Sequence, residues 1–202
     1  PWDERVTLEA ARGGHARSLE YAIVYSCPVH PDAAGVAAGE GHLDCLRVMW
    51  DYGWQQQVMS REYPLLSKEE LRQKIQQTRF PRELVLNESV TSQAVIHNRM
   101  DVLLAALREG CPCADDLVNL AAQAGNLGTL RYLIEDQLLA MTEDVFMAAL
   151  LQADLRCVQY LASIAGSHRH DPKITAAAAR LGRLDFLTIL REGSYIWDAR
   201  TC

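Results

Sequence analysis

The feature that most constrains this chain is a short motif that recurs along it. An alanine pair followed by a glycine break occurs at 10–15 and again at 37–42, so the two copies are 27 residues apart. Related copies, in which some of these residues are replaced, begin at 94, 121, 149 and 178. Repetition at a short period is typical of arrays of small structural units that stack on their neighbours.

These landmarks divide the chain of 202 residues into six repeats, an insertion and a tail. Repeats 1 to 6 span 1–26, 27–53, 84–110, 111–137, 138–166 and 167–193. The insertion spans 54–83 and separates repeats 1–2 (1–53) from repeats 3–6 (84–193). The tail, 194–202, contains Trp197-Asp198, which is similar to Trp2-Asp3 in repeat 1. We therefore expect the tail to start a further repeat and the array to continue beyond it.

Within each repeat the residue pattern predicts two short α-helices. The alanine pair ends a first helix, and the glycine that follows tolerates the positive φ that terminates helices. The second helix carries apolar residues one turn apart, as in Cys45, Leu46, Met49 and Trp50. One such hairpin cannot bury its apolar face alone, so we predict an all-α fold, an α-solenoid of stacked helix hairpins. The predicted core contains the alanine pairs at 10–11, 37–38 and 121–122, with Leu46, Leu103, Leu130 and Leu187.

An alanine pair, a Gly-His-Leu sequence, paired apolar residues and a closing glycine together resemble the ankyrin repeat. The best matches are Ala37-Ala38-Gly39-Glu40-Gly41-His42-Leu43 and Ala10-Ala11-Arg12-Gly13-Gly14-His15. The repeat here is shorter than the usual ~33 residues, and it lacks the Thr-Pro-Leu-His opening. This shorter repeat, with its connectors Cys27-Pro28, Cys111-Pro112 and Trp2-Asp3-Glu4, is similar to divergent ankyrin repeats of some algae and other protists. The resemblance implies protein binding without catalysis, and structural roles for His15 and His42 in bridging neighbouring backbones.

Composition narrows the functional classes. A net charge of −6 disfavours general binding to nucleic acid. The longest apolar run that we find, Val145 to Leu151, is far short of the ~20 residues that span a bilayer, so no membrane insertion is expected. Six cysteines are sparse for a disulfide-stapled secreted domain. We therefore expect reduced cysteines and an intracellular, reducing compartment, with the cytoplasm favoured over an organelle.

No pattern in the chain predicts chemistry. The sequence shows no glycine-rich phosphate loop, Ser-His-Asp order or metalloprotease helix. Cys111 and Cys113 with His97 lack the four-ligand spacing of a zinc site, and 168–171 is typical of a solvated connector. We therefore predict that the chain is not an enzyme and has no catalytic, cofactor or metal site.

Carboxylate pairs supply one candidate binding surface. Asp3-Glu4, Asp115-Asp116 and Glu143-Asp144 each lie near the predicted start of a first helix. Negative charge there complements the positive end of the helix dipole, which is the structural explanation. Because the pairs recur in the repeat, we also expect them to line one acidic edge that favours a basic or neutral partner.

The insertion supplies the second candidate surface. Six basic against four acidic residues give it a charge of +2, which leaves −8 for the remainder. Ser67-Lys68-Glu69-Glu70 has the pattern of a capping box, which predicts a helix ended by Pro81. Two interpretations stay open: a degenerate extra repeat, or a projecting helix that selects the partner. The candidate binding residues are Trp54, Lys68, Arg72 and Arg79.

The favoured function is a non-catalytic scaffold for protein–protein interaction, with a partner of unknown identity. Two alternatives stay open: a structural subunit of a large assembly, organellar or ribonucleoprotein, and a regulatory region of a larger enzyme. Terminal units of a solenoid need polar outer faces, which neither end of this sequence supplies. We therefore expect the terminal repeats to be covered by more chain or by a partner.

Overall fold

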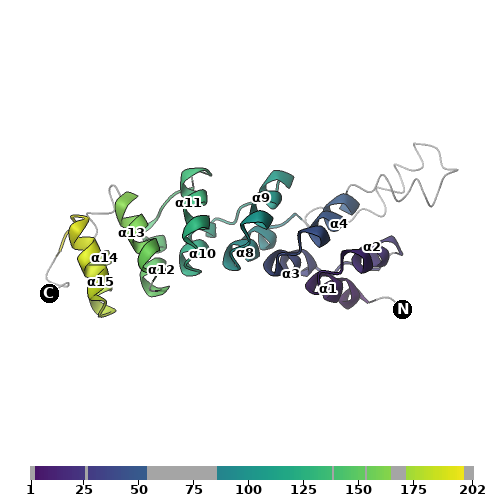
Figure 1. Cartoon of the computed structure of the whole chain (residues 1–202), viewed down its shortest axis with the longest axis horizontal. Coiled ribbons are helices and arrows are strands. Elements are labelled where there is room, and N and C mark those ends of the chain that lie inside the picture. The colour runs from purple at the N-terminus through teal and green to yellow at the C-terminus, as the bar shows by residue number, and fades with distance from the viewer. Residues whose placement is uncertain are drawn as a thin grey trace. The chain divides into compact units, whose positions relative to one another are not determined.

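The computed structural model describes residues 3–25, 27–53, 86–137, 139–152, 154–164 and 172–197. Within these residues the regular structure consists of α-helices, with no strand (Figure 1). The predicted all-α class is therefore confirmed for the described part of the chain. The insertion 54–83, which contains the residues predicted to select the partner, lies outside the described residues.

Two helices lie within each of the six predicted repeats. They are α1 (Glu4–Arg12) and α2 (Ala16–Val24), α3 (Ala33–Glu40) and α4 (Leu43–Gly53), α8 (Glu88–Ile96) and α9 (Met100–Glu109), α10 (Leu117–Gln123) and α11 (Leu127–Glu135), α12 (Glu143–Gln152) and α13 (Leu155–Ile164), and α14 (Pro172–Arg180) and α15 (Leu184–Glu192). We call these six the helix pairs of repeats 1 to 6.

The chain forms two compact bodies, Pro1–Ala114 and Asp115–Cys202. In the N-terminal body, α3 packs between α1 and α8, and α4 packs between α2 and α9. In the C-terminal body, α12 packs between α10 and α14, and α13 packs between α11 and α15. Each body is thus a layer of first helices lying against a layer of second helices.

A left-handed residue separates the two helices in five of the pairs. It is Gly14, Gly41, Asn98, Gly125 or Gly182, with φ between 55° and 85°. The backbone N–H of the next residue donates to the carbonyl five residues earlier, at distances of 2.7–3.4 Å. That acceptor is always the first alanine of the repeat motif: Ala10, Ala37, Ala94, Ala121 or Ala178. This is the Schellman arrangement, which satisfies the last carbonyls of a helix and reverses the chain.

The predicted core residues are buried, with one exception. The alanine pairs at 10–11, 37–38 and 121–122 are buried in first helices, and Leu46, Leu103 and Leu130 are fully buried in second helices. The prediction for Leu187 was wrong, because its side chain is half-exposed. Leu187 lies on α15, and no described helix packs on this pair from the C-terminal side.

A buried threonine joins the first helix to the connector that follows the pair in repeats 1, 3 and 6. Its hydroxyl lies within hydrogen-bond distance of a carbonyl one turn earlier and of a carbonyl 21 residues later. The later contacts are Thr7 to Pro28 (3.1 Å), Thr91 to Pro112 (2.9 Å) and Thr175 to Ile196 (3.0 Å). These contacts supply a partner to carbonyls that a chain leaving a helix pair must otherwise expose to solvent.

Two leucines that differ in burial test the packing of the helix pairs. Leu130→Ala should lower the free energy of unfolding by about 2–5 kcal/mol, because Leu130 is fully buried and the change leaves a cavity. Leu184→Ala is the matched control: Leu184 is 76% exposed, so its loss should change stability by less than about 0.5 kcal/mol. Urea unfolding followed by circular dichroism measures both. Equal effects would contradict the described packing.

Two glycines test the left-handed break. Gly41→Ala should cost about 1–2 kcal/mol, because φ is +85° and the added Cβ would lie 3.0 Å from Arg99 Nε. In contrast, Gly128 lies within α11 with open space around a built Cβ. Gly128→Ala should therefore stabilise the protein by about 0.5–1 kcal/mol, since alanine loses less backbone entropy in a helix. Thermal unfolding of both variants should move in opposite directions.

Candidate interaction surfaces

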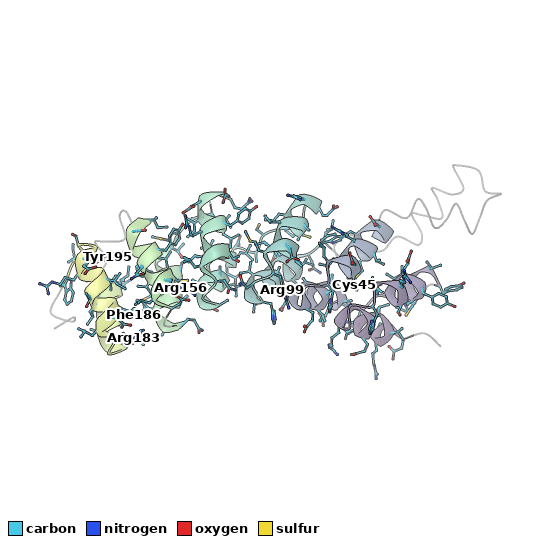
Figure 2. The ribbon with its side chains drawn as sticks, in the orientation of Figure 1. Cys45, Arg99, Arg156, Arg183, Phe186 and Tyr195 are labelled. Carbon is cyan, nitrogen blue, oxygen red and sulfur yellow. The ribbon has the colours of Figure 1, made fainter. Side chains whose placement is uncertain are left out.

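The residue after the left-handed break connects neighbouring repeats. His42 Nε2 donates to the carbonyl of Arg12 at 3.1 Å. Arg99, which is labelled in Figure 2, donates from Nε to the carbonyl of Gly39 at 3.2 Å. Both side chains precede a second helix, and both acceptors occupy the same position in the preceding repeat. The resemblance predicted such a role for histidines here. Arginine in the same role was not predicted, because its side chain differs in length, charge and shape.

Repeat 3 packs directly on repeat 2, although 54–83 separates them in the sequence. The first helices α3 and α8 are in contact along two glycines of α3. A Cβ added to Gly35 would lie 2.3 Å from Ser89 Oγ, and one added to Gly39 would lie 3.1 Å from His97 Cδ2. Two helices that approach this closely have no room for a further helix between them.

In the C-terminal body, the position equivalent to His42 and Arg99 is held by Asp154 in repeat 5 and by Arg183 in repeat 6. Asp154 caps α13 by accepting from the backbone N–H of Arg156 at 2.8 Å and of Cys157 at 3.3 Å. Burial alone would raise the pKa of Asp154, but these hydrogen bonds and the Arg156 charge outweigh it and lower the pKa. Arg183 instead forms two hydrogen bonds to Asp185, at 2.9 and 2.5 Å, and lies 4.3 Å from the centre of the Phe186 ring (Figure 2).

The predicted acidic residues lie at helix starts. Asp3 caps α1 by accepting from the Arg5 backbone N–H at 3.2 Å, and Glu4 lies in the first turn. Asp115 and Asp116 are exposed just before α10, and Asp116 makes no side-chain capping bond.

In the C-terminal body, two of the acidic pairs lie at or just before the starts of neighbouring first helices. Glu143 is the first residue of α12, which packs on α10, and Asp144 follows it with its side chain exposed. Asp115 and Asp116 therefore begin a helix next to the one that Glu143 and Asp144 begin. Asp3 and Glu4 belong to the other body, so a single edge that includes all three pairs stays a prediction.

The second candidate surface falls outside the described residues. Trp54, Lys68, Arg72 and Arg79 all lie in 54–83, for which the structure describes no placement. Their predicted role in selecting a partner therefore stays a prediction.

Sequence reasoning missed a polar cluster between α11 and α13. The Tyr160 hydroxyl donates to Glu135 Oε1 at 3.0 Å, and Arg131 Nε lies 3.4 Å from the same oxygen. The Arg131 guanidinium lies 5.6 Å from the centre of the Tyr160 ring. Burial, followed by the bond to Glu135, raises the pKa of Tyr160 to about 12, so this hydroxyl stays protonated. Tyr132 and Tyr160, at equivalent repeat positions, were the available signal.

The thiols of this chain are poorly placed for chemistry. The five described cysteines are free, and all except Cys113 are buried. Burial raises the pKa of Cys27, Cys45, Cys113 and Cys157, in the last case to about 11. A thiol that stays protonated is a weak nucleophile and a weak metal ligand. In the described part of the chain, no three His, Cys, Asp or Glu side chains form a group that could hold a metal ion.

Comparison with known proteins identifies no relative. No family model, curated protein or solved structure matches the chain. Within the described residues, none of the helices is long and apolar enough to cross a bilayer.

The pH dependence of stability should distinguish Asp154, which caps a helix, from an exposed carboxylate such as Asp115. Asp154→Ala should cost about 1 kcal/mol at neutral pH, the usual cost of losing a cap. Because folding lowers the pKa of Asp154, its contribution is present above the unfolded value of about 3.9. It is lost as pH falls through the lowered folded value.

The stability difference between wild type and Asp154→Ala should therefore disappear at low pH, as measured by urea unfolding across a pH series. Asp115→Ala, which removes an exposed carboxylate, should have little effect at any pH. A difference for Asp154→Ala that persists in strong acid would contradict the capping role.

Proposed function

We propose that this protein is a non-catalytic, ankyrin-like solenoid that binds another protein and selects it through residues 54–83. The recurring helix pairs, their common left-handed break and the hydrogen bonds between neighbouring pairs support the scaffold part of the proposal. Binding, rather than chemistry, is supported by buried thiols of raised pKa and by carboxylates that lie at helix starts.

One observation carries the role of the insertion: the scaffold is continuous without it. Arg99 bonds repeat 3 to repeat 2 at 3.2 Å, as His42 bonds repeat 2 to repeat 1 at 3.1 Å. The first alanines of repeats 2 and 3 are 57 positions apart, and removing the 30 residues of 54–83 restores 27. The same spacing of 27 separates repeats 1 and 2, and repeats 3 and 4. The insertion is therefore not needed for stacking, and a different role explains its presence.

The two candidate surfaces differ in charge, which indicates the kind of partner region that each would bind. The insertion carries +2 and the remainder of the chain −8, so they attract partner regions of opposite character. The acidic residues at 115–116 and 143–144 favour a basic or neutral surface, which adds affinity that weakens with salt. The insertion, which occurs once and carries Trp54 with several basic residues, supplies the irregular element that a repeated scaffold needs for specificity.

The proposal is tested by capturing proteins from an extract of the natural source on three immobilised forms of the chain. These are the wild type, a deletion of 54–83, and the full chain with Lys68→Glu, Arg72→Glu and Arg79→Glu. Mass spectrometry should find a protein that wild type retains in stoichiometric amount and that both variants lose. The deletion variant should unfold with the same midpoint as wild type, because its helix pairs restack at the 27-residue spacing.

A neutralised acidic surface is the matched control. Asp115→Asn, Asp116→Asn and Asp144→Asn together should weaken the capture of the same protein and its salt dependence, without abolishing it. Retention of every partner by the deletion variant would contradict the role of the insertion. A deletion variant that loses its helical signal would contradict the continuous scaffold.

A further inference from the structure

Repeats 5 and 6 expose leucines at the end of the helix pair where the first helix is followed by the second, which we call the turn end. Leu151 in α12 is 66% exposed, Leu155 at the start of α13 is 36% exposed, and Leu181 just after α14 is 40% exposed. Because α12 packs on α14 and α13 packs on α15, these side chains lie at the same end of adjacent helices. Apolar side chains that gather on one surface, rather than being scattered singly, are typical of an interaction site.

The repeat itself places these positions in solvent. At the position of Leu151, four of the other five pairs carry an exposed residue: Arg12, Ile96, Gln123 and Arg180. The same holds at the position of Leu181, for Gly13, Glu40, His97 and Gln152. Most of these residues are polar, so stacking does not require leucine here. Leu151 and Leu155 are exposed although α12 and α13 have a neighbouring helix pair packed on both sides.

Exposed arginines flank the leucines. Arg156 follows Leu155 and its side chain is 74% exposed, and Arg180, which precedes Leu181, is also exposed. Arg156 lies 3.4 Å from one oxygen of Asp154, and the remaining N–H groups of its guanidinium can serve a further acceptor. The turn ends of these two pairs are therefore both apolar and basic.

The two carboxylates nearby are already bound within the fold. Asp154 accepts from the backbone N–H groups of Arg156 and Cys157, and Asp185 accepts from the Arg183 side chain and the Phe186 backbone. These carboxylates are consequently poor partners for an incoming cation. Residues 154–156 and 180–185 together hold three arginines and two aspartates, a charge of +1.

The opposite end of the helix pairs in this body has the other sign. Asp115 and Asp116 are exposed before α10, and Asp144 is exposed in the first turn of α12. Charge complementarity thus favours an acidic partner at the turn ends and a basic partner at the opposite end. An anionic lipid surface is disfavoured at the turn ends, because the whole chain carries −6 and would be repelled by it.

The spacing of the leucines suits a helical partner. Packed helices such as α12 and α14 lie about 8–10 Å apart. On an α-helix, residues i and i+7 lie on one face about 10 Å apart, at a rise of about 1.5 Å per residue. A helix that runs along the array therefore places one apolar residue over repeat 5 and the next over repeat 6.

We propose that the turn ends of repeats 5 and 6 bind an acidic amphipathic helix of another protein. The apolar face of that helix covers Leu151, Leu155 and Leu181, and carboxylates beside this face pair with Arg156 and Arg180. The proposal rests on the scaffold of the proposed function but not on its insertion, and it adds a second recognition site of defined chemistry.

The test measures the binding of labelled synthetic peptides to the 202-residue protein by fluorescence anisotropy. The probe is an amphipathic peptide of about 15 residues, long enough to form a helix, with leucines at i, i+3, i+4 and i+7 and glutamates beside them. One control peptide has lysine for each glutamate, and the other has serine for each leucine. The glutamate peptide should bind about tenfold more tightly than either control, and added salt should weaken it.

Variants of the protein locate the site. Leu151→Ser and Leu181→Ser should each weaken binding of the glutamate peptide about tenfold, as expected for a residue at the centre of an interface. Ile96→Ser is the matched control: Ile96 is 41% exposed at the position of Leu151 in repeat 3, and its loss should change nothing. All three residues are exposed, so the variants should keep the wild-type circular dichroism spectrum.

A charge exchange tests the arginine. Arg180→Glu should weaken the glutamate peptide and strengthen the lysine peptide, by about threefold to tenfold in each case. The deletion of 54–83 should bind the glutamate peptide as wild type does. A failure of this site and a failure of partner selection by the insertion are therefore distinguishable.

Four outcomes overturn the proposal. Equal binding of the glutamate and lysine peptides would remove the acidic preference, and unchanged binding by both serine variants would place the peptide elsewhere. Sedimentation of the protein with vesicles of phosphatidylserine and phosphatidylcholine, without peptide binding, would identify a lipid surface instead. A dimer of wild type that Leu151→Ser dissociates would show that a second copy of the chain covers these leucines.

Discussion

The left-handed residue after the first helix is the constraint on which the remaining structure depends. It lets the backbone turn sharply enough for the second helix to return along the first, and it directs the next residue's N–H to the first alanine of the motif. That alanine is buried, and its small side chain lets the neighbouring helices approach closely. The side chain after the break then projects toward the preceding repeat, where His42 and Arg99 find a carbonyl. One backbone conformation thus produces the pair and places the contact between pairs.

Many polar side chains in the described residues make hydrogen bonds that support the fold. Buried threonines contact connector carbonyls, Asp3 and Asp154 cap helices, and Tyr160 with Arg131 and Glu135 joins neighbouring second helices. These contacts account for the polar side chains named here without any catalytic role.

The sequence was sufficient to predict the helical class and most of the core, because alanine pairs and leucines one turn apart state directly which faces are buried. It was insufficient where different residues do the same job: Asn98 adopts the left-handed conformation of a glycine, and Arg99 makes the bond of a histidine. The exposure of Leu187 was also missed, since its pattern matches buried leucines and its surroundings depend on what packs beside it. Contact between α3 and α8 joins residues too distant in sequence for a local pattern to reveal.

The close contact of Gly35 and Gly39 with α8 has a consequence for how this chain tolerates change in length. The stack fixes the two points that the segment between α4 and α8 connects, so forming the stack closes a loop of chain. The entropy of closing such a loop varies only with the logarithm of its length, so doubling it costs about 0.6 kcal/mol. A change in the length of the segment between α4 and α8 should therefore alter the stability of the stack only slightly, provided that Gly35 and Gly39 remain.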